Sequence, residues 1–371
     1  MTKIKIAIIF GGRSGEHVVS LRSAASIMET LDRDRYDIIP VGITREGGWI
    51  SGENTWQVLW KNEVPEDCFR TTLVMDPSCP GFLLWAKKDG RRHEIQSFRE
   101  VDVVFPVLHG TYGEDGTIQG LLEMAGLPYV GCGVLASAAG MDKAVMKELF
   151  IQHGLPVGRY LYFEQQDWSA DQNIWLERIE AEIGYPCFIK PANLGSSVGI
   201  SKAYHVEELI RGTEEAFAYD EKVIVEAFIP GREIECSVLG DREVRASLPG
   251  EIIPSQDFYD YKAKYIDDRS ELIIPAKLEE SLVKEIQALA IKSFKAIGGS
   301  GMARADFFVD VEKKKVVINE INTIPGFTSI SMYPKLWEVS GLPYRDLIER
   351  LIQIAMQKHE RRKRLINLPP I

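Results

Sequence analysis

With 371 residues, 45% of them hydrophobic and 26% charged, the chain can bury more than one hydrophobic core, and we expect two or three globular domains. A formal net charge of -10 argues against a nucleic-acid-binding protein, which needs a basic face to neutralise phosphates. Five scattered cysteines without a C-x-x-C pair favour reduced thiols in a cytoplasmic protein, and the N-terminal apolar run 4–10 is too short for a signal peptide or a membrane span.

The N-terminal part of the chain has the pattern of an α/β domain. Residues 4–10 are typical of a buried strand, and apolar residues at three- and four-residue spacing between 18 and 31 predict a helix. Further strands are predicted at 36–43 and 101–107, with the weakly patterned region 45–100 between them. A parallel βα unit therefore opens the protein, and we expect the first domain to span 1–132.

The next segment, 133–230, has the pattern of a small α+β domain. Helices are predicted at 143–153 and 173–183, and strands at 186–190, 198–203 and 223–226. The glycine-serine loop 191–199 separates the first two strands.

A third domain is expected over 231–371. It contains a strand at 233–239, a polar aromatic stretch at 255–271, a long helix at 279–297, and a hairpin of 303–311 with 315–321. No internal repeat is visible. The expected architecture is an α/β fold of three consecutive α/β or α+β units.

The predicted hairpin carries the most informative residues. Arg304 and Asp306 lie two apart on one strand, and Glu320 and Asn322 lie two apart on the next, so alternation places each pair on one face. A turn centred on Lys313 sets Asp306 opposite Glu320. A solvated, salt-bridged sheet face would explain either strand alone. Both strands together favour a magnesium site shared with phosphate, because the ligands are hard oxygens.

The loop from Lys190 to Gly199 is small, polar and glycine-bearing, so its backbone N–H groups can close over phosphates. It lacks the order of a P-loop, and an ordinary hairpin turn explains it equally well. Lys190 and Lys143 supply two cations, which favours a nucleotide triphosphate as the ligand.

Glu226 ends a strand and Glu233 begins the next. A connection between two domains can present such carboxylates to the amino group of adenine and to ribose hydroxyls. Read alone, however, glutamates at strand ends are usually just exposed.

Two polar residues follow strand ends of the first domain. Glu16, in the segment after Gly11-Gly12, either complements the helix dipole or holds a substrate ammonium in the crevice at the strand ends. His109 is expected to face the same crevice and is a candidate substrate residue, although a lone histidine is more often structural. The G-x-G-x-x-G spacing of a dinucleotide site is absent.

Eight segments in order resemble the D-alanine:D-alanine ligases of the ATP-grasp superfamily. They are FGGRSGEHVVS (10–20), HGTYGEDGTIQG (109–120), MDK (141–143), KPANLGSSVGISK (190–202), GREIECSVLG (231–240), YDYKAKY (259–265), GMARADFF (301–308) and NEINTIPGFTSISMYPKLW (319–337). The resemblance spans nearly the whole chain. It implies an ATP-grasp fold behind an N-terminal Rossmann-like domain, and a homodimer in the cytoplasm that serves peptidoglycan synthesis.

The resemblance also implies a role for individual residues. It implies two Mg²⁺ ions, a role that Mn²⁺ can also fill, on Asp306, Glu320 and Asn322. It implies ATP phosphate contacts from Lys143, Lys190, Ser196 and Ser197, adenine and ribose contacts from Glu226 and Glu233, and a contact of Lys264 with the transferred phosphate.

For the substrates, the resemblance implies that Glu16 holds the ammonium of the first D-alanine and Ser331 the carboxylate of the second. Glu16, Ser196 and Tyr265 would form a bridge that closes the 255–271 loop, while Arg304 and the Gly326 N–H would stabilise the oxyanion. Val18 stands where the family usually has glutamate, which leaves any contact of that carboxylate open.

The competing interpretations differ in substrate or in class. A D-alanine:D-lactate or D-alanine:D-serine ligase would share every ATP residue, and the loop from Tyr259 to Tyr265 argues against both. A non-catalytic ATP-binding protein on the same fold would not need the full set of Arg304, Asp306, Glu320 and Asn322. A dinucleotide-dependent oxidoreductase is disfavoured by the missing glycine spacing.

Overall fold

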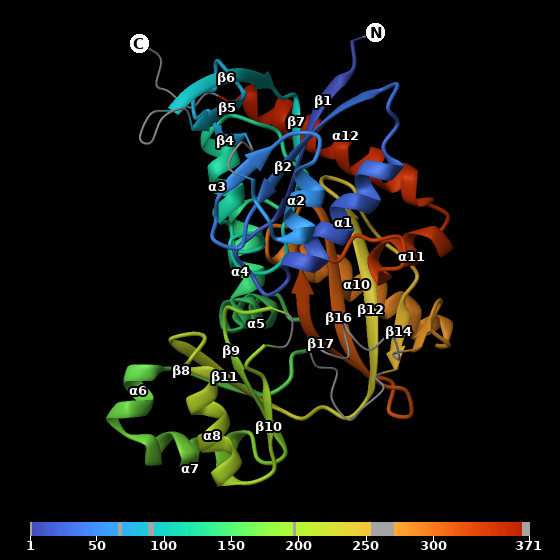
Figure 1. Cartoon of the computed structure of the whole chain (residues 1–371). Coiled ribbons are helices and arrows are strands. Elements are labelled where there is room, and N and C mark those ends of the chain that lie inside the picture. The colour runs from blue at the N-terminus through green and yellow to red at the C-terminus, as the bar shows by residue number, and fades with distance from the viewer. Residues whose placement is uncertain (1, 66–68, 88–92, 196–197, 254–270, 366–371) are drawn as a thin grey trace.

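Figure 1 shows the computed structural model of the chain, which describes residues 2–65, 69–87, 93–195, 198–253 and 271–365. These residues form a mixed α/β fold with three sheets, which lie within 4–107, 160–227 and 232–322. Because each sheet falls within one expected segment, we propose 1–132, 133–230 and 231–371 as the domains. In the described part of the chain, no helix is both long and apolar enough to cross a membrane.

The first sheet has seven strands in the order β6-β5-β4-β3-β2-β1-β7. The strand β1 (Ile4–Gly11) pairs in parallel with β2 (Tyr36–Ile43) and β7 (Val103–Val107), and α1 (His17–Thr30) follows β1, which confirms the predicted βα unit. Helices α3 (Thr117–Met124) and α4 (Val134–Met141) come after the sheet.

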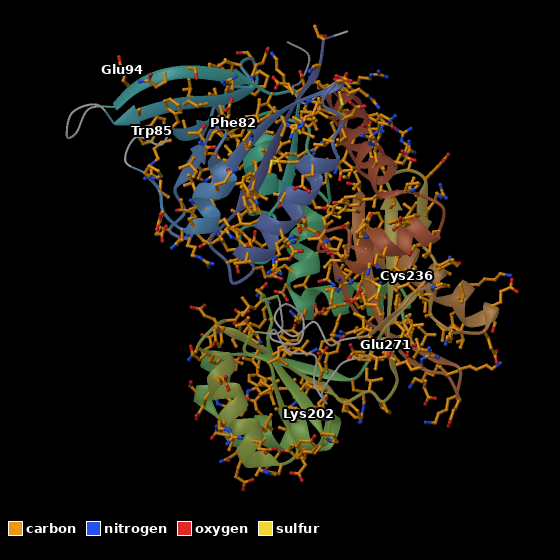
Figure 2. All side chains as sticks on the ribbon, turned by 45° about the vertical axis from the view of Figure 1, so that its right-hand side comes forward. Phe82, Trp85, Glu94, Lys202, Cys236 and Glu271 are labelled. Atoms are coloured by element: carbon orange, nitrogen blue, oxygen red, sulfur yellow. The ribbon has the colours of Figure 1, made fainter. Side chains whose placement is uncertain are left out.

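The region 45–100 extends this sheet with antiparallel strands that the sequence did not predict. They are β3 (Trp49–Ser51), β4 (Arg70–Leu73), β5 (Gly81–Lys87) and β6 (His93–Glu100), with α2 (Thr55–Lys61) between the first two. β3 and β4, with three and four residues, are too short for a period of two to stand out, and the pairing of the longer β5 and β6 is interrupted by a register shift between Leu84 and Trp85. Phe82, Trp85 and Glu94 mark the projecting β5–β6 hairpin in Figure 2.

The central sheet is antiparallel, in the order β10-β9-β11-β8, and its strands are β8 (Tyr160–Glu164), β9 (Cys187–Pro191), β10 (Ser201–Ala203) and β11 (Lys222–Ala227). Its segment also holds the helices α5 (Lys143–Gln152), α6 (Gln165–Ala170), α7 (Gln172–Glu182) and α8 (Val206–Ala216). The two predicted helices and three predicted strands are present. The sheet has a hydrophobic cluster of its own, which includes Phe163, Trp168 and Ile189.

The third sheet has six strands. Five follow the order β15-β14-β12-β16-β17, and β13 pairs with β12. The strands are β12 (Arg232–Gly240), β13 (Val244–Ala246), β14 (Gly250–Ile253), β15 (Glu271–Ile273), β16 (Gly301–Asp310) and β17 (Lys315–Asn322), and the helices are α10 (Glu280–Ala296), α11 (Met332–Val339) and α12 (Tyr344–Lys363). Apart from Glu271, the stretch 255–271 lies outside the described residues.

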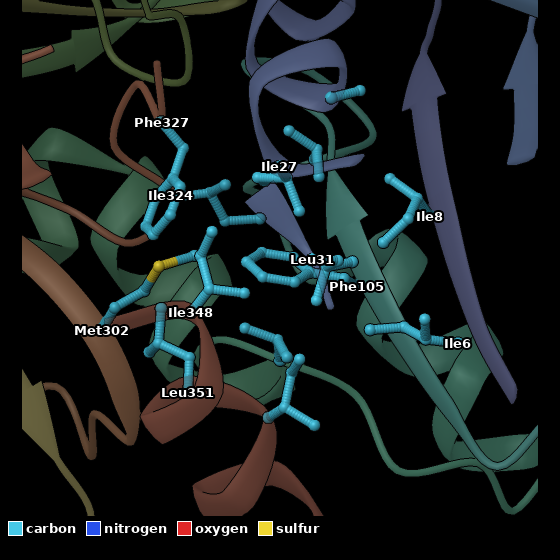
Figure 3. Close-up of a cluster of buried hydrophobic side chains, with 14 of the residues drawn as sticks. Ile6, Ile8, Ile27, Leu31, Phe105, Met302, Ile324, Phe327, Ile348 and Leu351 are labelled. Atoms are coloured by element: carbon cyan, nitrogen blue, oxygen red, sulfur yellow. The ribbon is translucent and has the colours of Figure 1, made fainter. Parts of the chain in front are cut away.

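The first and last parts of the chain share one core (Figure 3). Side chains of β1, α1 and β7 pack against Met302 of β16, the segment after β17, and α12. Phe105 meets Phe327 edge to face, with ring centroids 5.8 Å apart. The Tyr344 hydroxyl donates to the Phe327 carbonyl oxygen at 2.7 Å. The segment after β17 is therefore held by both ends of the chain.

Candidate active site

The β16–β17 hairpin has the pairing that the sequence predicts, with Asp306 opposite Glu320 and Arg304 opposite Asn322. A β-bulge produces this register: Asp310 pairs with Lys315 near the turn, but the pairing shifts between Asp306 and Phe307. Asn319 is the extra residue of the bulge.

Arg304 is the centre of a charged cluster on this hairpin. Its guanidinium donates to both carboxylate oxygens of Asp306, at 2.8 and 2.7 Å, and lies 3.0 Å from a Glu235 oxygen. The Asn322 amide donates to Asp306 at 2.9 Å. Burial alone lowers the pKa of Arg304, but Asp306 and Glu235 outweigh burial and raise it well above its usual value. Glu235 was not predicted from the sequence, although it lies two residues after Glu233 on β12.

A cleft between the central and third sheets brings several predicted residues together. Lys190, Glu226, Glu233, Arg304, Asp306 and Glu320 all line it. Its apolar lining includes Phe188, Phe228 and Ile200. Lys202, labelled in Figure 2, lies with its ammonium nitrogen 4.5 Å from the centroid of the Phe228 ring. The cleft thus combines an apolar lining with several charged groups.

Glu226 is buried, not exposed as its strand-end position alone would suggest. One carboxylate oxygen is 2.6 Å from the Lys147 ammonium, and the other pairs with Lys190. Burial alone raises the pKa of Glu226, but the two lysines outweigh burial and hold it well below the usual range. Lys147 was not predicted from the sequence, where its only signal is its position one helical turn after Lys143.

Lys143 is the first residue of α5, a helix that the Asp142 side chain caps by accepting the N–H groups of Ala144 and Val145. The Lys143 ammonium is buried and donates to the Leu194 carbonyl at 2.6 Å, so it reaches the glycine-serine loop. Burial lowers the pKa of Lys143, and nearby Lys190 lowers it further. Ser196, Ser197, Lys264 and Tyr265 lie outside the described residues.

Glu16 lies where the first domain meets the glycine-serine loop. It is 8% exposed, and a Cβ atom at Gly195 would stand 3.4 Å from one of its carboxylate oxygens. Gly110 has a φ of +74°, and a Cβ atom there would stand only 2.7 Å from the same oxygen. The segment 109–116 and the residue before α1 are therefore brought together, as expected.

His109 is buried, and both of its ring nitrogens are within hydrogen-bonding distance of protein atoms. Nδ1 lies 2.9 Å from the Ile324 carbonyl, and Nε2 lies 3.2 Å from the Ser23 hydroxyl. Burial lowers the pKa of His109. A neutral ring must donate from Nδ1 to the carbonyl, so Nε2 accepts from Ser23. Ser23 in turn accepts the Phe327 N–H at 3.2 Å.

Glu114, which was not predicted as a site residue, binds the same segment. Its carboxylate accepts the N–H groups of Gly110 at 2.9 Å and of Ile324 at 3.2 Å. Burial, followed by the neighbouring carboxylate of Glu16, raises the pKa of Glu114 to about 8.

Gly326 therefore lies between two residues, Ile324 and Phe327, whose backbones are bonded to the first domain. A Cβ atom at Gly326 would stand 3.3 Å from the Ser331 hydroxyl, so these two predicted site residues are neighbours. That hydroxyl accepts the Thr328 N–H at 3.1 Å.

The chain is similar to one group of enzymes over nearly its whole length. Residues 5–132 match a family model described as D-ala D-ala ligase N-terminus, and residues 149–353 match one described as D-ala D-ala ligase C-terminus. A D-alanine--D-alanine ligase of Caldicellulosiruptor bescii is 51% identical over 366 residues, which are 98% of each chain. One of Heliobacterium modesticaldum is 51% identical over 364 residues, again 98% of each chain.

Solved structures give the same result. The VanG D-Ala:D-Ser ligase from Enterococcus faecalis is 38% identical, with a TM-score of 0.84 over 95% of this chain and 100% of that one. The D-alanine-D-alanine ligase from Coxiella burnetii is 37% identical, with a TM-score of 0.83 over 98% of this chain and 97% of that one. The chain therefore belongs to the D-alanine:D-alanine ligase family, as its sequence motifs predict.

Proposed function

We propose that this chain uses ATP to join two D-alanine molecules into D-alanyl-D-alanine for the synthesis of peptidoglycan precursors. The observation that carries the proposal is the β16–β17 hairpin, which sets Asp306 opposite Glu320 and places Arg304 beside them in the cleft. Family membership over both parts of the chain supports it.

The first step activates a carboxylate, because an amine cannot displace oxide or hydroxide from it. An oxygen of the first D-alanine attacks the γ-phosphorus of ATP, the bond to ADP breaks, and D-alanyl phosphate forms. We assign charge neutralisation to Lys143 and Lys190, which lie at the glycine-serine loop and in the cleft, together with Lys264. We assign the backbone and hydroxyl groups of Ser196 and Ser197 to the phosphates as well.

The apolar cleft fits a nucleobase, because Phe188, Phe228 and Ile200 can enclose a flat ring. Glu226 and Glu233 line the same cleft, and we assign them to the adenine amino group and the ribose hydroxyls.

The metal site that we propose consists of Asp306, Glu320 and Asn322. Two carboxylates and an amide oxygen are the hard ligands that magnesium prefers, and two Mg²⁺ or Mn²⁺ ions would neutralise charge on the transferring phosphate. Within the described residues, no three His, Cys, Asp or Glu side chains gather in a preformed metal cluster. We assign the remaining coordination positions to phosphate oxygens of ATP.

In the second step, the neutral amine of the second D-alanine attacks the acyl carbon. Phosphate leaves, and the new amide loses a proton. We assign the developing oxyanion to Arg304 and the Gly326 N–H, the first ammonium to Glu16, and the second carboxylate to Ser331. A donor aimed at such an oxyanion contributes roughly 3–4 kcal/mol to lowering the barrier. His109 acts by holding the segment that carries Gly326, since both of its ring nitrogens bind protein atoms.

The alternative function is a ligase that joins D-alanine to D-serine or D-lactate. The similarity to a D-Ala:D-Ser ligase is the reason to test it. We further propose a cytoplasmic homodimer. The experiment is to incubate purified protein with ATP, magnesium and D-alanine, adding D-serine or D-lactate in separate arms. We expect one D-alanyl-D-alanine for each phosphate released. ATP hydrolysis without any dipeptide would contradict the proposal, and a mixed product would select the alternative.

A further inference from the structure

We infer that Lys147 is a positioning residue for nucleotide binding, acting through the carboxylate of Glu226, and this inference rests on the proposed function. Two lysine ammonium groups pair with the single buried carboxylate of Glu226. Glu226 is 7% exposed, and each of its oxygens has its own lysine, Lys147 on one side and Lys190 on the other.

The two lysines differ in what else surrounds them. Lys190 opens the glycine-serine loop, where a triphosphate would draw its ammonium toward the phosphates. Lys147 is carried by α5 and is 3% exposed. Its ammonium also donates to the carbonyl of Asn319, the bulge residue of β17, at 3.0 Å. This hydrogen bond to Asn319 holds Lys147 between the central and third sheets.

This arrangement allows Glu226 to keep one lysine partner when the other lysine moves away. A buried carboxylate that loses its last cation becomes strongly unfavourable, so Lys190 can leave Glu226 only if another cation remains. Lys147 is that cation. It keeps Glu226 ionised and oriented toward the cleft while Lys190 turns to the phosphates.

Without Lys147, Lys190 is the remaining ion-pair partner of Glu226. Moving the Lys190 ammonium to the ATP phosphates would then leave the buried Glu226 carboxylate without a cation, so ATP should bind more weakly. We therefore expect Lys147→Met to raise the KM for ATP about tenfold or more while kcat changes less than about threefold. A tenfold change corresponds to about 1.4 kcal/mol. Lys147→Arg keeps a cation at this position and should recover most of the ATP affinity.

The decisive measurement is a double-mutant cycle with Glu226→Gln, with binding of a non-hydrolysable ATP analogue measured by calorimetry. If Lys147 acts through Glu226, adding Lys147→Met to Glu226→Gln should weaken binding by less than about twofold. An undiminished tenfold loss in that background would mean that Lys147 contacts the nucleotide itself, and the inference would be overturned. Equal losses in kcat and ATP affinity would also overturn it.

Lys222→Met is the matched control for stability. Lys222 likewise forms a largely buried ion pair, with Asp142 at 2.5 Å, in the same part of the chain, but it does not line the cleft. Lys222→Met should lower the melting temperature without a tenfold rise in the KM for ATP. A rise in KM equal to that of Lys147→Met would count against a specific role of Lys147. Dipeptide synthesis by the parent is measured in parallel, so that a failure of the proposed function is seen separately.

Discussion

Replacing Arg304 by methionine removes the cation that two mostly buried carboxylates share. The guanidinium makes two bonds to Asp306 and one ion pair with Glu235, whose side chains are 14% and 9% exposed. Removing one partner of a buried ion pair typically costs about 3–5 kcal/mol, because a charge is left without compensation. We therefore expect the free energy of unfolding to fall by about that much.

The same substitution should lower turnover on the order of a hundredfold or more, since it also removes a proposed oxyanion donor. Turnover is measured as phosphate release at saturating ATP and D-alanine, well below the melting temperature. Stability is measured by urea unfolding.

Arg232→Met provides the control, because Arg232 makes a similar two-pronged pair with Glu251 on neighbouring strands of the same sheet. Its side chain is 30% exposed, so the loss of stability should be smaller, and turnover should stay within about threefold of the parent. An Arg304→Met protein as stable as the parent would refute the charge argument. Equal losses of turnover in the two variants would show that general damage to the sheet, not a lost donor, lowers activity.

Glu320→Gln should abolish magnesium-dependent phosphate release while the circular dichroism spectrum stays native, since an amide binds magnesium far less well; near-normal release would contradict the metal assignment. Gly110→Ala should raise the KM for D-alanine, because a φ of +74° strains any residue with a Cβ atom and the 2.7 Å approach would displace the Glu16 carboxylate; an unchanged KM would separate Gly110 from the substrate site. Tyr265→Phe removes the hydroxyl of the bridge that the family resemblance implies, so it should yield some D-alanyl-D-lactate when both acceptors are present. The yield should be higher at pH 6 than at pH 8, because the D-lactate hydroxyl is uncharged whereas the D-alanine amine must lose a proton before it attacks; dipeptide alone at both pH values would place acceptor choice elsewhere. The pKa of Glu114 is about 8 in the folded protein, above its ordinary value, so the stability that this group contributes is complete below its unfolded pKa and is lost as the pH rises through 8. Urea unfolding at pH 6 and pH 9 should therefore show a smaller alkaline loss in Glu114→Gln than in the parent, and identical losses would exclude Glu114 as the cause.

The hairpin was predictable because buried and more exposed residues alternate along β16 from Ala303 to Asp310. Its register was predicted correctly without the bulge that produces it. Continued from the Asp310–Lys315 pair, an unbroken ladder would set Asp306 opposite Asn319, and the extra residue moves Glu320 into that place. A bulge depends on local backbone geometry and leaves no mark in a pattern of polar and apolar residues.

Other site features depend on contacts between segments far apart in the chain. Nothing in the sequence relates Lys147 to Glu226, because their ion pair joins α5 to β11 only in the folded chain. Similarly, the bonds of His109 and Ser23 to the segment after β17 join residues more than 200 positions apart. The motifs identified which segments matter, whereas burial and partners emerged only from the packing of three sheets.

The shared core of Figure 3 has a consequence for how the protein opens. Residues near both ends of the chain, such as Ile6 and Leu351, belong to one cluster, whereas the central sheet has its own. Cooperative unfolding units follow packing, not chain order. Amide hydrogens of β1, β7 and α12 should therefore exchange with solvent in a single concerted event, while those of β9 and β11 exchange independently. Trimming α12 from one end would then loosen a strand that begins at residue 4.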